Sequence, residues 1–140
     1  MSFHIDPCVW SELVRPKPHR RLVGWIEAQD ESRLYLSVIT IGEIQKGIAK
    51  LPASSRKERL VTWLDEELVE RFKGKILSID LTVARQWGHI QAACELRGLK
   101  MPVVDAFIAA IALLSDMTIV TRNEQDMAAS GAKIFNPWMA

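Results

Sequence analysis

The chain has 140 residues, a formal net charge of +1, 49% hydrophobic residues and 25% charged residues. This length predicts a single domain over residues 1–140. The small net charge excludes a strongly basic protein that coats nucleic acid and a protein with a long acidic tail. The two cysteines, Cys8 and Cys94, form neither a disulfide scaffold nor a zinc motif. No signal peptide opens the chain, and its longest apolar stretch is too short to cross a membrane. We therefore expect a soluble, cytoplasmic protein.

Strand-like and helix-like segments alternate along the chain. The sequence predicts strands at residues 2–5, 34–39, 75–79, 117–121 and 132–135. It predicts helices beginning near residue 9 and over residues 20–28, 40–50, 60–72, 83–94, 103–114 and 124–130. This alternation is typical of an α/β fold with a mainly parallel sheet flanked by helices on both faces. Functional sites in such folds gather beyond the carboxyl ends of the strands.

Two acidic residues follow the first two predicted strands. Asp6 ends the first strand and precedes Pro7, so it can be the N-cap of a short helix with proline at its first position. Glu43 lies in TIGEIQKGI, where Thr40 and Glu43 match the T-x-x-E capping box. Alternatively, both carboxylates point at the same edge of the sheet and belong to one functional site. The residues alone leave both interpretations open.

Asp105 is the strongest single indication of a functional site. It is the only charged residue in MPVVDAFIAAIALL, a segment that is apolar on nearly every side and is therefore expected to be buried. A buried carboxylate without a partner is unfavourable and tends to become neutral. The helix N-terminus favours its charge, but a metal cation or a basic side chain is the better partner.

Further polar residues follow the later strands. Asn123 and Asp126 come after the fourth strand and are candidates for the same acidic rim, although Asn123 can equally cap a helix and Asp126 can be a solvated charge. Asp80 also ends a strand, and we interpret it as a helix cap. Three or four such oxygen ligands suit Mg²⁺ or Mn²⁺. One or two of these ions can orient a water molecule for in-line attack on a phosphodiester.

Several segments, in order and with matching spacing, resemble the PIN-domain ribonucleases, specifically the VapC and FitB-like toxins of bacterial toxin–antitoxin pairs. They are HID followed by VWSELVRP, then LYLSVITIGEIQKGIAKLP, MPVVDAFIAAIAL, and TIVTRNEQDM with the tail AKIFNPW. The resemblance covers essentially the whole chain. It implies that residues 1–140 form a single PIN domain with the PIN-like three-layer sandwich.

The resemblance also implies a function, a Mg²⁺-dependent endoribonuclease that Mn²⁺ can also support. It places the catalytic and metal-binding roles on Asp6, Glu43 and Asp105, and the fourth site position on Asn123 or Asp126. It implies a VapB-like antitoxin that covers the acidic cleft, a homodimer, operator DNA bound only through the antitoxin, and no membrane contact.

Two basic segments accompany these acidic residues. They contain Lys17, Arg20 and Arg21, and Arg56, Lys57 and Arg59. Taken singly, these residues fit solvated helix faces, but as two groups they can hold RNA phosphates around an acidic centre.

The chain departs from the family pattern at the end of its first strand. VapC-like proteins usually read Asp-Thr-Asn there, whereas this chain reads Asp6-Pro7-Cys8. The change removes a hydroxyl and an amide that would support the acidic site, and proline removes a backbone donor as well. Losing a residue that hydrogen-bonds to a metal ligand typically lowers metal affinity or activity by about one to two orders of magnitude. The alternative function is therefore a catalytically degenerate PIN domain that acts mainly as an antitoxin-binding partner.

Other α/β phosphate-handling proteins fit the sequence less well. A haloacid-dehalogenase-like phosphatase needs a second Asp where Cys8 stands, and a receiver domain needs a late lysine where Arg122 stands. A nucleotide-binding module needs a glycine-rich phosphate loop, and the chain has none.

Overall fold

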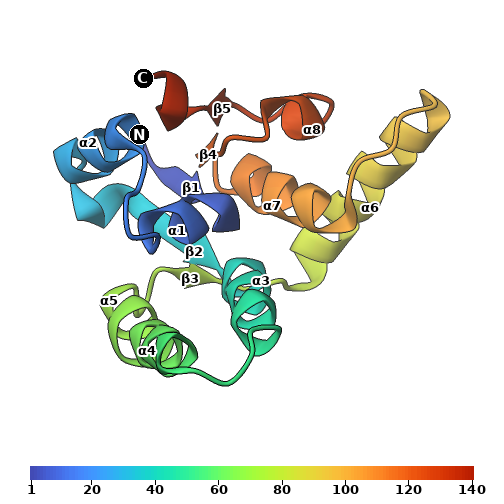
Figure 1. The fold of residues 1–140 in the computed structure, drawn as a ribbon. Coiled ribbons are helices and arrows are strands. Elements are labelled where there is room, and N and C mark those ends of the chain that lie inside the picture. Colours follow the sequence, from blue (N-terminus) through green and yellow to red (C-terminus); the bar gives the residue numbers. More distant parts are fainter.

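The computed structural model describes all 140 residues and contains a five-stranded sheet between layers of helices (Figure 1). The strands are β1 (Phe3–Ile5), β2 (Leu34–Ser37), β3 (Ile76–Leu77), β4 (Thr118–Val120) and β5 (Ile134–Phe135). They lie in the order β3-β2-β1-β4-β5, and every neighbouring pair is parallel. The first strand is therefore central, and the direction of strand progression switches between β1 and β4. Ligand sites of parallel sheets lie beyond the carboxyl ends of the strands at such a switch.

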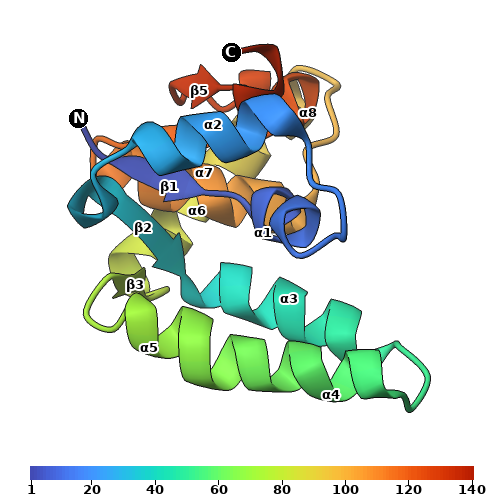
Figure 2. The same ribbon diagram turned by 60° about the vertical axis from the view of Figure 1, so that its left-hand side comes forward.

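Helices cover both faces of the sheet (Figures 1 and 2). On one side lie α1 (Pro7–Leu13), α2 (Arg20–Ala28) and the C-terminal turn η3 (Pro137–Met139). On the other side lie α6 (Leu81–Leu96) and α7 (Val103–Leu114), with the short α8 (Glu124–Ala128) beside α7. A helical hairpin extends away from the sheet in Figure 2, formed by α3 (Val38–Ala49), α4 (Ser55–Thr62), the π-helical η2 (Trp63–Leu68) and α5 (Val69–Arg71). None of the helices combines the length and apolarity that crossing a membrane requires.

Alternation along the strands creates two separate cores. Ile5 and Leu36 belong to the cluster that includes α1 and α2, whereas Ile119 packs with α6 and α7. In β4 the switch occurs between adjacent residues, because Val120 lies in the first cluster and Ile119 in the second. This period of two is the signature of a strand buried on both faces. The α/β fold with a parallel sheet flanked by helices is confirmed.

The structure corrects the start of the helix that carries Glu43. Thr40 and Glu43 do not form the capping box, so that prediction is wrong. Ser37 is the N-cap instead: its hydroxyl accepts the Thr40 N–H at 3.4 Å, and the Thr40 hydroxyl accepts the Ser37 N–H at 3.4 Å. Because serine at an N-cap competes well for the first free amides, α3 begins at Val38, two residues earlier than predicted. Glu43 therefore lies in the second helical turn.

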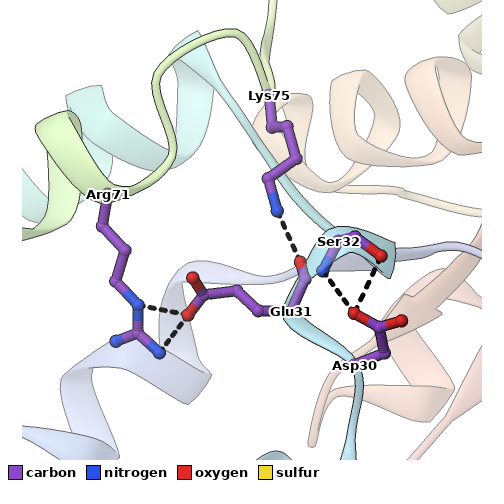
Figure 3. Close-up of polar contacts among 5 residues, drawn as sticks. All are labelled: Asp30, Glu31, Ser32, Arg71 and Lys75. Atoms are coloured by element: carbon purple, nitrogen blue, oxygen red, sulfur yellow. Dashed lines mark hydrogen bonds and ion pairs between the residues drawn. The ribbon is translucent and has the colours of Figure 1, made fainter.

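The amino edge of the sheet carries a compact polar cluster (Figure 3). Glu31 belongs to the 3-10 turn η1 (Glu31–Arg33) that leads into β2, and its carboxylate pairs with the guanidinium of Arg71 on α5. The Lys75 ammonium donates to the Glu31 carbonyl and also lies over the rings of Tyr35 and Phe72. These contacts tie the base of the helical hairpin to the beginnings of β2 and β3.

Candidate active site at the carboxyl edge of the sheet

Asp6 lies at the end of the central strand, where it is 3% exposed. It is the N-cap of α1 with Pro7 at the first helical position, so the predicted cap is confirmed. Its Oδ2 atom accepts the Cys8 N–H at 3.4 Å and the Thr121 hydroxyl at 3.1 Å. Burial raises the pKa of this carboxyl group, hydrogen bonds from Cys8 and Thr121 oppose that rise, and the charge of Glu43 adds to it. Asp6 is therefore both a helix cap and a member of an acidic group.

Asp105 is the third residue of α7 and lies across the edge from Asp6. It is half-buried rather than fully buried, because the first turn of α7 reaches the surface, where Val103 is 57% exposed. It makes no hydrogen bond through its side chain and no ion pair, so the basic partner considered from the sequence is absent. Burial, the largest cause, and the charges of Asp6, Asp126 and Glu43 together raise the pKa of Asp105 to about 6.

The causes of these two pKa shifts connect four carboxylates from four elements, because Asp6, Asp126 and Glu43 act on Asp105, and Glu43 also acts on Asp6. Asp6 follows β1, Glu43 is half-buried on α3, Asp105 is on α7, and Asp126 is exposed on α8. Like charges disfavour one another's ionisation over a few ångströms, and no lysine or arginine of the chain pairs with any of the four. We call these four residues the acidic centre.

Asn123 and Asp80 lie near strand ends but differ from the acidic centre. Asn123 occupies the N-cap position of α8, its side chain makes no capping bond and is exposed, and its backbone N–H donates to the Thr121 hydroxyl at 3.0 Å. Asp80 caps α6 by accepting the Val83 N–H at 2.9 Å, so its interpretation as a helix cap is confirmed.

Sequence reasoning missed Thr121, which is fully buried directly after β4. Its hydroxyl contacts Asp6 across 115 positions of sequence. The signal in the sequence is a polar residue at the end of the apolar strand TIVT, but a hydroxyl is a weaker indication of a metal site than a carboxylate. The structure thus supplies to Asp6 a hydroxyl that position 7 lacks.

The acidic centre fits a hard divalent cation by the chemistry of its donors. All four side chains offer carboxylate oxygens, which Mg²⁺ and Mn²⁺ prefer, and their mutual repulsion is compensated by no cation of the protein. The side chains are not drawn together into a ready coordination shell, since no three His, Cys, Asp or Glu residues lie within reach of one ion.

Two cavities flank the acidic centre. One, of about 200 Å³, lies between α1, α3 and α4; its walls are mostly apolar, and its only charged residues are Glu43 and Arg56. The other, of about 390 Å³, lies between α8 and the turn that joins α6 to α7, where Arg97 and Lys100 lie near Asp126. A basic residue therefore accompanies an acidic-centre residue on each side.

Comparison with known proteins places the chain in a family. Residues 4–130 match the PIN domain. The chain is 38% identical over 136 residues to the plasmid stability protein StbB of Pseudomonas syringae pv. tomato, covering 97% of this chain and 98% of that protein. It is 34% identical over 134 residues to the VapC ribonuclease Y4jK of Sinorhizobium fredii, covering 96% of each. The crystal structure of FitAcB from Neisseria gonorrhoeae superimposes with a TM-score of 0.94 at 32% identity, covering 99% of each chain.

These matches define a PIN-domain protein. Within that class, the chain belongs to the VapC/FitB family of toxins from toxin–antitoxin systems, a ribonuclease family. Several similar solved structures are toxin–antitoxin complexes, and some of them include DNA fragments. The predicted family and PIN-like fold are confirmed.

Proposed function

We propose that this chain is a cytoplasmic toxin that cuts RNA as a metal-dependent endoribonuclease, with residues 1–140 forming a single PIN domain. The observation that carries the proposal is Asp105, an unpaired, half-buried carboxylate whose pKa is raised to about 6. The chain keeps four carboxylates together without supplying a cation, which is the electrostatic arrangement of a site that takes its cation from solution. The ribonuclease names of relatives support RNA as the substrate.

Asp6, Glu43 and Asp105 would hold Mg²⁺ or Mn²⁺, and Asp126 or Asn123 would complete the site. A bound divalent cation supplies a nucleophilic water at neutral pH and neutralises charge on the phosphodiester. The protein's own part is to present these carboxylates from separate elements at one edge of the sheet, where they would move closer together to share one ion.

The two predicted basic clusters contribute unequally to phosphate binding. Lys57 donates to the carbonyls of Ala49 at 3.4 Å and Leu51 at 3.0 Å, so it fixes the turn after α3. Arg56, in contrast, lines the cavity that contains Glu43. Arg20 and Arg21 line a further cavity at the start of α2. We propose that Arg56, which shares a cavity with Glu43, binds a phosphate of the RNA.

We propose that a VapB-like antitoxin covers the acidic centre and the apolar cavity beside Glu43. The cavity offers Trp10 and Trp63 to an apolar segment and Arg56 to an acidic one. Exposed apolar residues on α6 and α7, including Leu96 at 89% and Leu114 at 45%, support a homodimer. Operator DNA would be bound only through the antitoxin.

The test is RNA cleavage by the purified chain with Mg²⁺ and with Mn²⁺, compared with EDTA and with Asp105→Asn. Metal-dependent cleavage that is lost in the variant is expected. A folded chain that leaves total cellular RNA intact under every metal condition would contradict the enzymatic function.

The second candidate function is a degenerate PIN domain that mainly binds an antitoxin, favoured by Pro7 and Cys8. A double variant with threonine at position 7 and asparagine at position 8 separates the two. If the parent is inactive and the variant cleaves RNA, the site of the parent is degenerate. If both cleave at similar rates, Pro7 and Cys8 are compatible with catalysis.

A further inference from the structure

The Thr121 hydroxyl is the centre of a small buried network. It lies 3.1 Å from Asp6 Oδ2, 3.0 Å from the backbone nitrogen of Asn123 and 3.6 Å from Cys8 Sγ. Thr121 itself is 0% exposed and is held by its own N–H, which donates to the Phe135 carbonyl at 3.0 Å. The hydroxyl therefore has little freedom to leave Asp6.

The direction of each hydrogen bond follows from the number of available protons. A threonine hydroxyl has one proton to donate and two positions at which to accept. An ionised Asp6 can only accept, so the Thr121 proton is directed to Oδ2, while the Asn123 N–H occupies one accepting position. The Cys8 thiol lies beside the other accepting position, with its sulfur 3.6 Å from the hydroxyl oxygen.

The network engages only one oxygen of Asp6. The hydrogen bonds from the Thr121 hydroxyl and the Cys8 N–H both end on Oδ2, and Oδ1 accepts neither of them. We propose that Thr121 and Cys8 are positioning residues that fix Oδ2 of Asp6 and leave Oδ1 as the oxygen that binds a divalent cation. This inference rests on the proposed function in one respect only, namely that the acidic centre binds a metal.

The network also gives Cys8 a role at a position where the family usually has asparagine. The thiol is a weak donor and does not replace an amide in strength. It does complete the bonds of Thr121, whose hydroxyl is delivered by the neighbouring strand β4. In this chain the side-chain hydrogen bond that holds Asp6 therefore comes from Thr121 at the end of β4, the strand next to β1.

The test measures Mn²⁺ affinity by calorimetry on the full chain, without RNA. Thr121→Val removes the hydroxyl at nearly constant volume, and Thr121→Ser keeps it. Thr118→Val is the matched control, because Thr118 is also buried in β4 and its hydroxyl makes no hydrogen bond within the protein. Cys8→Ala removes the thiol alone. Thermal melting without metal reports the stability of each variant.

We expect Thr121→Val to weaken Mn²⁺ binding by about 10- to 100-fold, the usual effect of losing a partner of a metal ligand. Thr121→Ser and Thr118→Val should retain the parent affinity within about twofold, and Cys8→Ala should weaken it by about two- to tenfold, because a thiol interacts weakly. If Thr121→Val does not fold, a weakened affinity in folded Cys8→Ala supports the proposal and an unchanged one overturns it.

Equal affinities in Thr121→Val and Thr118→Val would overturn the positioning role, as would a parent chain that binds no Mn²⁺. A parent that binds Mn²⁺ through Thr121 yet cleaves no RNA would leave the positioning role intact and contradict the endoribonuclease function. The two proposals therefore fail in distinguishable ways.

Discussion

The amino and carboxyl edges of the sheet both carry clustered charges, but the protein treats the two clusters differently. At the amino edge, Glu31 pairs with Arg71, and hydrogen bonds from Ser32 hold the pKa of Asp30 below its usual range (Figure 3). At the carboxyl edge, Asp105 has no partner and its pKa rises to about 6. The paired charges at the amino edge hold structural elements together. The unpaired carboxylates at the carboxyl edge indicate the end of the sheet where a ligand is expected to bind.

The largest expected effect comes from making the same substitution at the two edges. Asp105→Asn should lower the rate of metal-dependent RNA cleavage by at least about hundredfold, because it removes a charge from the acidic centre. Asp116→Asn is the matched control, since Asp116 is exposed at the turn before β4 and its positive φ of 50° suits asparagine. Cleavage is measured under single-turnover conditions. Equal losses in both variants would contradict the special role of the carboxyl edge.

The next effect concerns His4, in the central strand between the edges. His4 is fully buried, and burial lowers its pKa from 6.5 to about 4, although an interaction with the Ile108 backbone opposes this shift. The unfolded chain therefore binds more protons between pH 4 and 6.5, and this residue makes stability rise with pH across that window, by about 3 kcal/mol in all.

His4→Leu should remove this contribution. Urea unfolding of parent and variant between pH 4 and 7 provides the measurement, and the stability of the parent relative to the variant should increase with pH. A constant difference between the two curves would show that His4 carries no proton-linked cost.

A smaller effect is expected in the pH dependence of folding stability, to which Asp105 at the carboxyl edge should contribute. Because the pKa of Asp105 is raised on folding, the folded chain binds more protons between about pH 4 and 6, and Asp105 makes stability fall as pH rises through that window. The stability of metal-free Asp105→Asn relative to the parent should therefore grow from pH 4 to 6. The slope due to His4 is common to both chains and cancels in this difference.

Mn²⁺ should reverse the disadvantage of the parent. At 100 times the dissociation constant, a ligand bound only by the folded state stabilises it by about 2.7 kcal/mol. Melting at pH 7.5 with Mn²⁺ should show this gain in the parent and much less in Asp105→Asn, and the gain should shrink at pH 5 as protons compete for Asp105. Equal gains in both chains would place metal binding elsewhere.

The smallest effect is expected at the amino edge. Arg71→Met breaks the ion pair with Glu31, whose two side chains are 53% and 44% exposed. Such an exposed pair contributes about 0–1 kcal/mol, and 1 M NaCl should reduce the difference between parent and variant. Mn²⁺ affinity should not change. A change in Mn²⁺ affinity would show that the two edges are coupled through the sheet.

The sequence was informative where the evidence is local. An acidic residue after an apolar strand and a lone charge in an apolar helix are short-range patterns, so Asp6 and Asp105 could be proposed without a structure. Two other features could not be predicted, because one depended on competition between capping residues and the other on a contact between residues far apart in the sequence. Two capping boxes overlapped at Thr40, and the one that begins at Ser37 formed. Thr121 reaches Asp6 only because β4 pairs with β1, and no local pattern encodes that contact.

The position of β1 at the centre of the sheet also determines when the acidic centre can form during synthesis. A ribosome adds about 5–20 residues per second, so β4 is made on the order of ten seconds after the strand with which it pairs. Until then Asp6 lacks both the β4 backbone and the Thr121 hydroxyl, even though Glu43 and Asp105 have already been added. The acidic centre is therefore a late product of folding, and a nascent chain that ends before residue 121 carries three of its four carboxylates without their arrangement.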